Sequence, residues 1–411
     1  MSSERAASEP GVPRPGMIPL SEPLLDGRER EYVLDCLDSG WVSSAGPYVT
    51  RLERWARERF SAAGAAAVAS GTAALHIALL LAGVRPGDEV ILPALTFIAP
   101  AYAVRYVGAH PVFLDVEPEY WQLDPSALRS FLRTSCSREG GRLVDRRSGR
   151  PVTAVVPVHV LGHPCDMDPI VELAHESGLV VVEDATESLG SLYKGRPAGL
   201  LGDIGCLSFN GNKIVTAGGG GLIVTRREEL AERAAHLTTQ AKDDPVEYVH
   251  SELGFNYRLT NLQAAVGLAQ VERLDEFVVA RRRIAAAYGA ALAGVPGIEL
   301  MPEAPWATSN RWLSAVLVRE PEYGQDRRGL MDGLAAEGVQ ARPLWQPLHR
   351  SAAFESVAGG APWVADRLHA EGLCLPSSAT LSSADQARVV SVIRGLRGAA
   401  RERGRQARDP G

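Results

Sequence analysis

A single lysine, Lys213, lies between a short apolar run and four consecutive glycines in the segment SFNGNKIVTAGGGG, residues 208–221. This is not a Walker A loop, because in that loop the lysine follows the glycines and precedes Ser or Thr. A solvent-exposed lysine in a turn is one alternative. The other is a lysine at the end of a buried strand, where its amine could attack a carbonyl group or anchor a carbonyl cofactor.

Asp184 ends the apolar run VVVED, residues 180–184. A run of this kind predicts a buried strand, and an acid at its carboxyl end faces the crevice in which open α/β sheets bind ligands. Taken alone, Asp184 is weak evidence, because acids at strand ends more often cap the next helix.

The triplet Ser70-Gly71-Thr72 separates a predicted strand from a predicted apolar helix. The first N–H groups of a helix lack partners and its dipole is positive there, so the position suits a phosphate, although an ordinary N-cap is the alternative. Together the three features meet the needs of pyridoxal phosphate: a phosphate site, a carboxylate for the pyridine nitrogen and an amine for the aldehyde. We therefore assign Lys213 as the covalent anchor and Asp184 as the partner of the pyridine nitrogen. The glycines would form a turn with unusual dihedral freedom.

Three further side chains could contact this cofactor, each with a structural alternative. Ser208, on the strand before the lysine, could offer its hydroxyl to the phosphate or serve the strand alone. Phe97 could stack on the pyridine ring or belong to the core. Glu187 could reach the O3′ edge of the ring or cap the next helix.

The elements that must position these residues alternate along the chain. Apolar runs predict strands, and the segments between them predict helices such as 73–82, 169–177 and 228–237. The predicted strands are 65–69, 89–92, 112–114, 154–157, 180–183, 206–209 and 221–225. This pattern indicates an α/β fold with a mostly parallel sheet covered by helices on both faces. The charged, glycine-containing segment 135–151 predicts a surface hairpin.

We predict two domains between two disordered tails. Residues 1–16 and 399–411 are polar and rich in Pro, Gly or Arg, which favours disorder. Residues 17–274 would form a large cofactor-binding domain and residues 275–398 a smaller C-terminal α+β domain. After a long helical stretch near residues 261–292, a predicted strand near 312–318 and a predicted helix near 327–337 indicate the second domain.

Composition argues against several classes of partner. The 411 residues carry a net charge of −6 with both signs scattered, so no nucleic-acid partner is expected. The start of the chain does not resemble a signal peptide, and the uncharged stretch 62–84 is alanine-rich and interrupted by polar residues, so no membrane span is expected. Five cysteines without a CxxC pair favour reduced thiols in a cytoplasmic enzyme without a metal site.

Long stretches of the chain resemble the DegT/DnrJ/StrS-type nucleotide-sugar aminotransferases, which are fold type I pyridoxal-phosphate enzymes. The resemblance covers about residues 17–395 and includes EDATESLGSLYKGRPAGLLGDIGCLSFNGNK, SGTAALHIALLLAGVRPGDEVILPALTF and GFNYRLTNLQAAVGLAQ. It implies a homodimer with active sites at the subunit interface, in which Asn256 and Arg258 would reach the partner subunit's cofactor phosphate or substrate. It also implies that Gly71, Thr72 and Ser208 hold the phosphate.

Where many relatives have a histidine three residues before the lysine, this chain has Asn210. In this it resembles a branch of C4 aminotransferases, which implies transfer of an amino group from L-glutamate to UDP-4-keto-6-deoxy-N-acetylglucosamine. The alternatives are GDP-4-keto-6-deoxymannose, giving a perosamine-type product, and an amino-sugar sensor that binds pyridoxal phosphate without turnover. A nicotinamide-dependent dehydrogenase would need GxGxxG after the first strand, which SGTAAL lacks.

Four more side chains are candidates for sugar-nucleotide binding, and each could serve packing or face solvent instead. His159, Arg342 and His349 lie in segments expected to line the sugar-nucleotide cleft, and Arg342 could bind the diphosphate or the glutamate carboxylate. Trp41 could shape the sugar pocket.

Overall fold

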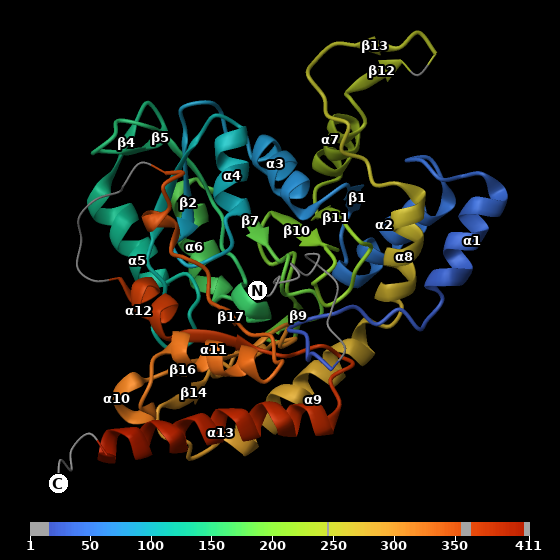
Figure 1. Ribbon diagram of the computed structural model, residues 1–411. Coiled ribbons are helices and arrows are strands. Elements are labelled where there is room, and N and C mark those ends of the chain that lie inside the picture. Colours follow the sequence, from blue (N-terminus) through green and yellow to red (C-terminus); the bar gives the residue numbers. More distant parts are fainter. Residues whose placement is uncertain (1–15, 245, 355–362, 407–411) are drawn as a thin grey trace, which may run out of the picture.

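The computed structural model describes residues 16–244, 246–354 and 363–406 (Figure 1). The predicted N-terminal tail lies outside these ranges except for Gly16. Helix α13 (Ser383–Gln406) continues past residue 398, so the start predicted for the C-terminal tail does not coincide with the end of a helix.

A seven-stranded sheet forms the centre of the larger part of the molecule, in the order β1-β11-β10-β7-β6-β2-β3. Strand β11 is antiparallel to both of its neighbours, and the remaining pairings are parallel, which confirms the mostly parallel sheet. The strands lie within two residues of the predicted bounds: β1 Gly64–Val68, β2 Glu89–Pro93, β3 His110–Leu114, β6 Val152–Val155, β7 Val180–Asp184, β10 Ile204–Ser208 and β11 Gly221–Thr225.

The sheet is buried on both faces because side chains alternate along each strand. In β7, Val182 belongs to one hydrophobic cluster and Val181 to another, and in β2 Leu92 and Ile91 divide in the same way. The helices of this part are α1 Glu29–Ser39, α2 Pro47–Phe60, α3 Gly71–Leu81, α4 Ala99–Tyr106, α5 Pro125–Ser130, α6 Met167–Ser177, α7 Glu228–Thr238 and α8 Asn261–Val271.

Two further segments can be compared with their predicted structure. The segment 135–151 contains the antiparallel pair β4 (Cys136–Glu139) and β5 (Arg142–Asp145), which confirms the predicted hairpin. The long helical stretch is instead two helices, α8 and α9 (Leu274–Leu292), because residues 272–273 lie outside both.

A second, four-stranded sheet in the order β14-β16-β18-β17 carries its own hydrophobic cluster. Ile18, which the predicted boundaries place in the large domain, packs in this cluster, and its backbone bonds to Gly338 and Gln340. The elements here are β14 Ile298–Leu300, β16 Ser314–Val318, α10 Glu320–Tyr323, α11 Arg327–Ala336, β17 Arg342–Pro343, α12 Val364–Glu371, β18 Gly372–Leu375 and α13. The division at residue 274 remains our proposal.

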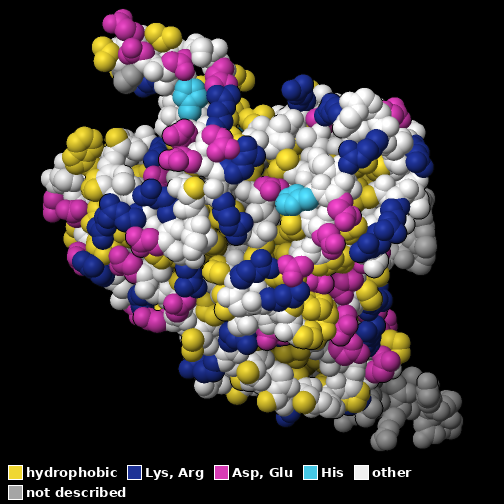
Figure 2. Space-filling model, turned by 180° about the vertical axis from the view of Figure 1, so that it is seen from behind, with side chains coloured by type: hydrophobic (Ala, Val, Ile, Leu, Met, Phe, Trp, Pro, Cys, Tyr) yellow, Lys and Arg dark blue, Asp and Glu magenta, His cyan; other side chains and the backbone are white. Residues whose placement is uncertain are grey.

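A small hairpin projects from the body of the molecule beside α7 (Figure 1). It consists of β12 (Lys242–Asp244) and β13 (Val249–His250). Figure 2 shows hydrophobic and acidic side chains at its tip, and basic and acidic side chains interspersed over the face seen there. A three-stranded sheet of β15 (Ala307–Thr308), β8 (Leu192–Tyr193) and β9 (Arg196–Pro197) joins the two parts of the chain.

All five cysteines are free and buried. Within the described ranges, no helix combines the length and apolar character that crossing a bilayer requires.

Candidate active site

A cavity of about 340 Å³ opens at the carboxyl ends of strands β1, β10, β7, β6 and β2. This is the edge at which open α/β sheets bind ligands. Its lining consists of Ser70, Gly71, Thr72, Leu75, Thr96, Phe97, Ala99, Pro100, Val158, Asp184, Thr186, Glu187, Ser208, Asn210, Asn212, Lys213, Gly219, Gly220, Trp312 and Trp345. The three features that pointed to a cofactor therefore meet in one place.

The Lys213 side chain is 12% exposed, so it is not a free lysine on a surface turn. Its Nζ lies 3.3 Å from Oε1 of Glu187 and 4.2 Å from the ring centroid of Trp312. The indole N–H of Trp312 also donates to the carbonyl of Asn212, at 2.7 Å. Trp312 thus holds the backbone next to the lysine, and Glu187 and the Trp312 ring hold its amine.

Asp184 is the last residue of β7 and is almost fully buried. Its Oδ1 accepts the backbone N–H of Thr186 at 3.0 Å, and no helix starts after it, so the helix-cap alternative is wrong. Burial raises the pKa of Asp184, and the bonds from Thr186 and the charge of Lys213 only partly oppose this. A buried carboxylate in this state suits a cationic partner such as a protonated pyridine nitrogen.

The N-terminus of α3 also lines the cavity. Ser70 caps the helix, with its Oγ accepting the N–H of Ala73 at 3.0 Å. At Gly71 a Cβ atom would lie 2.8 Å from Cβ of Ser208, so a larger residue would fill the space between the helix and the end of β10. Gly71, Thr72 and Ser208 thus form a cradle that fits a phosphate group.

Glu187 and Phe97 also take positions that fit the cofactor. The Glu187 carboxylate is buried and accepts the N–H of Leu161 at 2.8 Å, and burial raises its pKa. Phe97 lines the cavity and is 52% exposed, so the core alternative for this residue is wrong. An exposed aromatic face is suited to stack on a planar ring.

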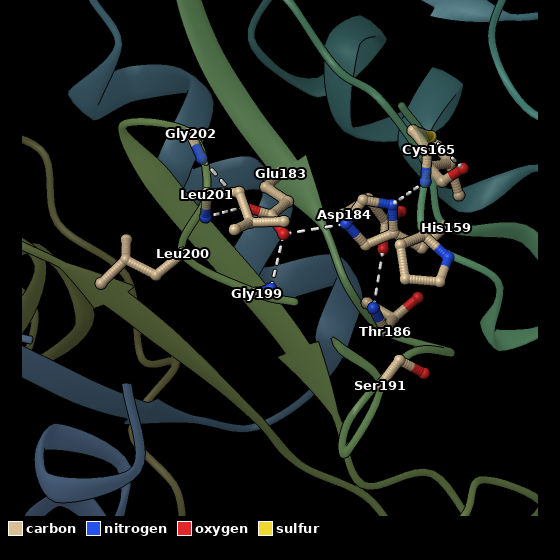
Figure 3. Close-up of polar contacts among 12 residues, drawn as sticks. His159, Cys165, Glu183, Asp184, Thr186, Ser191, Gly199, Leu200, Leu201 and Gly202 are labelled. Atoms are coloured by element: carbon tan, nitrogen blue, oxygen red, sulfur yellow. Dashed lines mark hydrogen bonds and ion pairs between the residues drawn. The ribbon is translucent and has the colours of Figure 1, made fainter. Parts of the chain in front are cut away.

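Several predicted substrate residues do not line this cavity. His159 is fully buried and bonded to Glu183 and Cys165, so its expected place in the sugar cleft is wrong (Figure 3). His349 bonds to Asp366 at 3.0 Å and stacks on a tryptophan. Arg342 is an exposed residue of β17. Of the predicted substrate residues, Asn210 lines the cavity.

Trp41, Asn256 and Arg258 also lie outside the cavity lining. Trp41 and Asn256 are exposed. Arg258 forms an ion pair with Glu53, which occupies its guanidinium within the same chain.

Four of the lining residues that sequence reasoning missed come from loops and turns. Trp312 and Trp345, from the C-terminal part, cover the cavity with their rings nearly parallel at 13° and their centroids 6.4 Å apart. Thr186 and Asn212 belong to the turns beside Asp184 and Lys213. Because Thr186 and Asn212 are polar and lie next to the predicted catalytic residues, the sequence could have indicated them as site residues. Nothing in the sequence near Trp312 and Trp345 indicated that they would cover the cavity.

Comparisons with known proteins agree with this geometry. The family model described as DegT/DnrJ/EryC1/StrS aminotransferase family matches residues 23–394. The chain is 40% identical over 380 residues to the putative pyridoxal phosphate-dependent aminotransferase EpsN of Bacillus subtilis, covering 92% of this chain and 95% of the relative. It is 38% identical over 379 residues to the GDP-perosamine synthase of Caulobacter vibrioides, covering 92% and 97%.

Among solved structures, DesI in the presence of its TDP-sugar product is similar, with a TM-score of 0.83 and 31% identity over 96% of this chain and 95% of that one. Fold, site and sequence agree, so the fold is that of the type I pyridoxal-phosphate enzymes. The chain belongs to the DegT/DnrJ/EryC1/StrS aminotransferase family, and it is an aminotransferase whose cofactor is pyridoxal phosphate.

Proposed function

We propose that this aminotransferase moves the amino group of L-glutamate to the C4 ketone of a nucleotide-linked 4-keto-6-deoxy sugar. The observation that carries the proposal is the meeting of Lys213, Asp184 and the N-terminus of α3 in one cavity. Relatives named for a GDP-linked and a TDP-linked sugar support a nucleotide sugar as the acceptor.

Two acceptors compete. The GDP-perosamine synthase relative favours GDP-4-keto-6-deoxymannose, which is the alternative in the sequence analysis. UDP-4-keto-6-deoxy-N-acetylglucosamine, which the sequence analysis places first, rests on Asn210. We therefore place the GDP sugar first and keep the UDP sugar as the second candidate.

When bound, pyridoxal phosphate carries the amino group from donor to acceptor and stores negative charge in its protonated ring. Asp184 would balance the charge at the pyridine nitrogen. Gly71, Thr72 and Ser208 would hold the phosphate at the start of α3, since the first N–H groups of a helix favour an anion. Phe97 would lie against the ring.

Lys213 would be the point of covalent attachment for the cofactor, and its amine would also serve in the proton transfers. Its Nζ would take the proton from Cα of glutamate and later deliver a proton to C4 of the sugar. The Glu187 carboxylate, 3.3 Å from Nζ, is placed to exchange a proton with this amine. The tryptophan cover over Nζ limits access of water to it.

A homodimer would complete the site. Of the described residues that line the cavity, Lys213 alone is cationic, although a nucleotide sugar brings a diphosphate. We propose that a second copy supplies further groups. Asn256, exposed on this chain, is the candidate to reach the partner's cofactor phosphate, whereas the ion pair with Glu53 leaves Arg258 a structural role.

The role of the lysine is tested by Lys213→Ala. Borohydride should fix the cofactor to the wild-type protein and not to the variant, and transamination should fall by about 10²–10⁴-fold, the usual worth of a proton-transfer group. Lys194→Ala removes an exposed lysine held by Asp168 and should change neither result. Wild-type turnover by Lys213→Ala would refute the role.

The acceptor is identified by incubating the enzyme and L-glutamate with each 4-keto sugar and measuring the amino-sugar product by mass spectrometry. We expect a higher kcat/KM with the GDP sugar. A preference for the UDP sugar would restore the second candidate. Cofactor binding without turnover of either sugar would favour a sensor.

A further inference from the structure

Behind Asp184, on the other side of β7, lies a second buried carboxylate that the proposed mechanism does not use. Glu183 precedes Asp184 on the strand, so the two side chains point to opposite faces of the sheet. Glu183 is fully buried. Figure 3 shows it between the imidazole of His159 and the loop 199–202.

The loop holds Glu183 with backbone N–H groups. Gly199 donates to Oε1, Leu201 donates to Oε2, and Gly202 donates to Oε2 at 3.0 Å. Gly199 has φ of +123°, and a Cβ at Gly202 would lie 2.7 Å from a side-chain atom of Val181. Such converging N–H groups form a backbone nest for an anion, which explains the glycines of this segment.

His159 completes the set as a neutral donor. Its Nδ1 accepts the backbone N–H of Cys165 at 3.1 Å, so that nitrogen carries no proton. The other nitrogen, Nε2, therefore carries the proton and donates it to Oε1 of Glu183 at 2.8 Å. These bonds lower the pKa of Glu183 against the effect of burial, so the carboxylate keeps its charge.

His159 also ties this unit to Asp184. Its backbone N–H donates to the carbonyl of Asp184 at 3.1 Å, and Val158 beside it lines the cavity. The remaining titratable groups around Asp184 are Lys213 and Glu187 on the cavity side and the neutral, buried thiol of Cys206 on β10. On the cavity side, two buried carboxylates, Asp184 and Glu187, thus act on one buried ammonium, while Glu183 lies behind them on the other face of the sheet.

We propose that Glu183 is a positioning residue for Asp184. The fixed negative charge of Glu183 strengthens the hold on the proton that lies between Asp184 and the pyridine nitrogen of the cofactor. A negative charge behind Asp184 favours a positive charge in front of it. The inference rests on the proposed role of Asp184 and does not depend on which sugar is the substrate.

The experiment uses pyridoxal phosphate labelled with nitrogen-15 at the ring nitrogen, bound to the full-length protein without substrate. The chemical shift of that nitrogen reports its protonation and is followed as the pH is raised. Glu183→Gln keeps the shape and removes the charge, so we expect the deprotonation midpoint to fall by about one pH unit, a tenfold weaker hold on the proton.

Two further variants keep the inference testable if Glu183→Gln does not fold. His159→Gln can still accept from Cys165 and donate to Glu183, so it should titrate like wild type. His159→Leu removes the donor, which raises the proton affinity of Glu183 and should lower the midpoint in the same direction. Wild-type titration of folded Glu183→Gln, or of His159→Leu where the first does not fold, would overturn the inference.

A matched control lies at the other end of β7. Asp203 accepts the N–H of Val181 at 2.8 Å and bonds to His175 at 3.1 Å, and neither Asp203 nor His175 lines the cavity. Asp203→Asn should leave the midpoint unchanged. Asp184→Asn separates the two proposals: an unchanged titration there would refute the role of Asp184, whereas a changed one beside unaltered Glu183→Gln would refute the role of Glu183 alone.

Discussion

At the scale of single residues, the site depends on the small size of Gly71. This residue lets the start of α3 approach the end of β10, where a Cβ would lie 2.8 Å from Ser208. Gly71→Ala should raise the dissociation constant of pyridoxal phosphate by about tenfold or more, because overpacking of this kind costs about 1–3 kcal/mol.

The measurement is a fluorescence titration of the protein with the cofactor. Gly289→Ala is the control, since this glycine lies in α9 with open space where the Cβ would be. It should leave cofactor affinity unchanged and raise stability by up to about 1 kcal/mol. Equal affinity of Gly71→Ala and wild type would show that the cradle does not bind the phosphate.

Asp184 should also make stability depend on pH. Its pKa is raised in the folded, cofactor-free protein, so the folded state binds this proton more tightly than the unfolded chain does. That contribution to stability is complete below the unfolded pKa of about 3.9 and is lost as the pH rises through the folded pKa. The ionised Asp184 carboxylate therefore lowers the stability of the folded, cofactor-free protein at neutral and alkaline pH.

Asp184→Asn stays neutral and can still accept from Thr186. Without cofactor it should have a higher Tm than wild type at alkaline pH, and the gain should shrink as the pH is lowered. Added pyridoxal phosphate should stabilise wild type more than the variant. Thermal unfolding at several pH values checks this, and a difference that instead grows toward acid pH would contradict it.

At the scale of the element, the α3 cap serves both the helix and the site. Ser70→Ala removes the acceptor for the N–H of Ala73 and should cost about 1 kcal/mol of unfolding free energy. Because the same turn borders the cavity, cofactor affinity should fall several-fold as well. Denaturant unfolding and cofactor titration measure the two effects.

Asp326→Ala is the matched control, because Asp326 caps α11 through a 2.8 Å bond from Gly329, outside the cavity lining. It should lose similar stability and keep wild-type cofactor affinity. If both variants bind the cofactor like wild type, the start of α3 is an ordinary cap.

At the scale of the whole molecule, we propose the β12–β13 hairpin and the segment after it as the surface that meets a second copy. Val246 and Tyr248, between the two strands, are 77% and 68% exposed, and Leu253, three residues after β13, is 80% exposed. Exposed apolar groups gathered on a projection favour a protein interface. We expect light scattering to give about twice the 43.9 kDa of one chain.

Leu253→Glu and Tyr248→Glu should shift the protein toward monomer and lower activity at low protein concentration, with an unchanged circular dichroism spectrum. Val279→Glu places the same charge at an exposed position on α9 and should remain dimeric. A wild-type mass from Leu253→Glu or from Tyr248→Glu would place the interface elsewhere.

The sequence by itself determined the elements and the centre of the site. Apolar runs alternating with helices specify a parallel sheet, and the carboxyl ends of parallel strands share one edge. Residues that follow those strands, such as Lys213, Asp184 and Gly71, are therefore expected to meet on the basis of chain order alone. Their residue types already indicated pyridoxal phosphate, and the family motifs added a nucleotide sugar as the expected substrate.

Only the tertiary structure decided which polar side chains face the cavity. His159 follows a strand as the site residues do, yet Val158 beside it lines the cavity and His159 bonds Glu183 instead. Consecutive side chains of an extended chain point to opposite sides, so of two neighbouring residues one faces the cavity and the other faces away from it. The cover formed by Trp312 and Trp345 likewise depends on how loops of the second sheet pack, which no local pattern specifies.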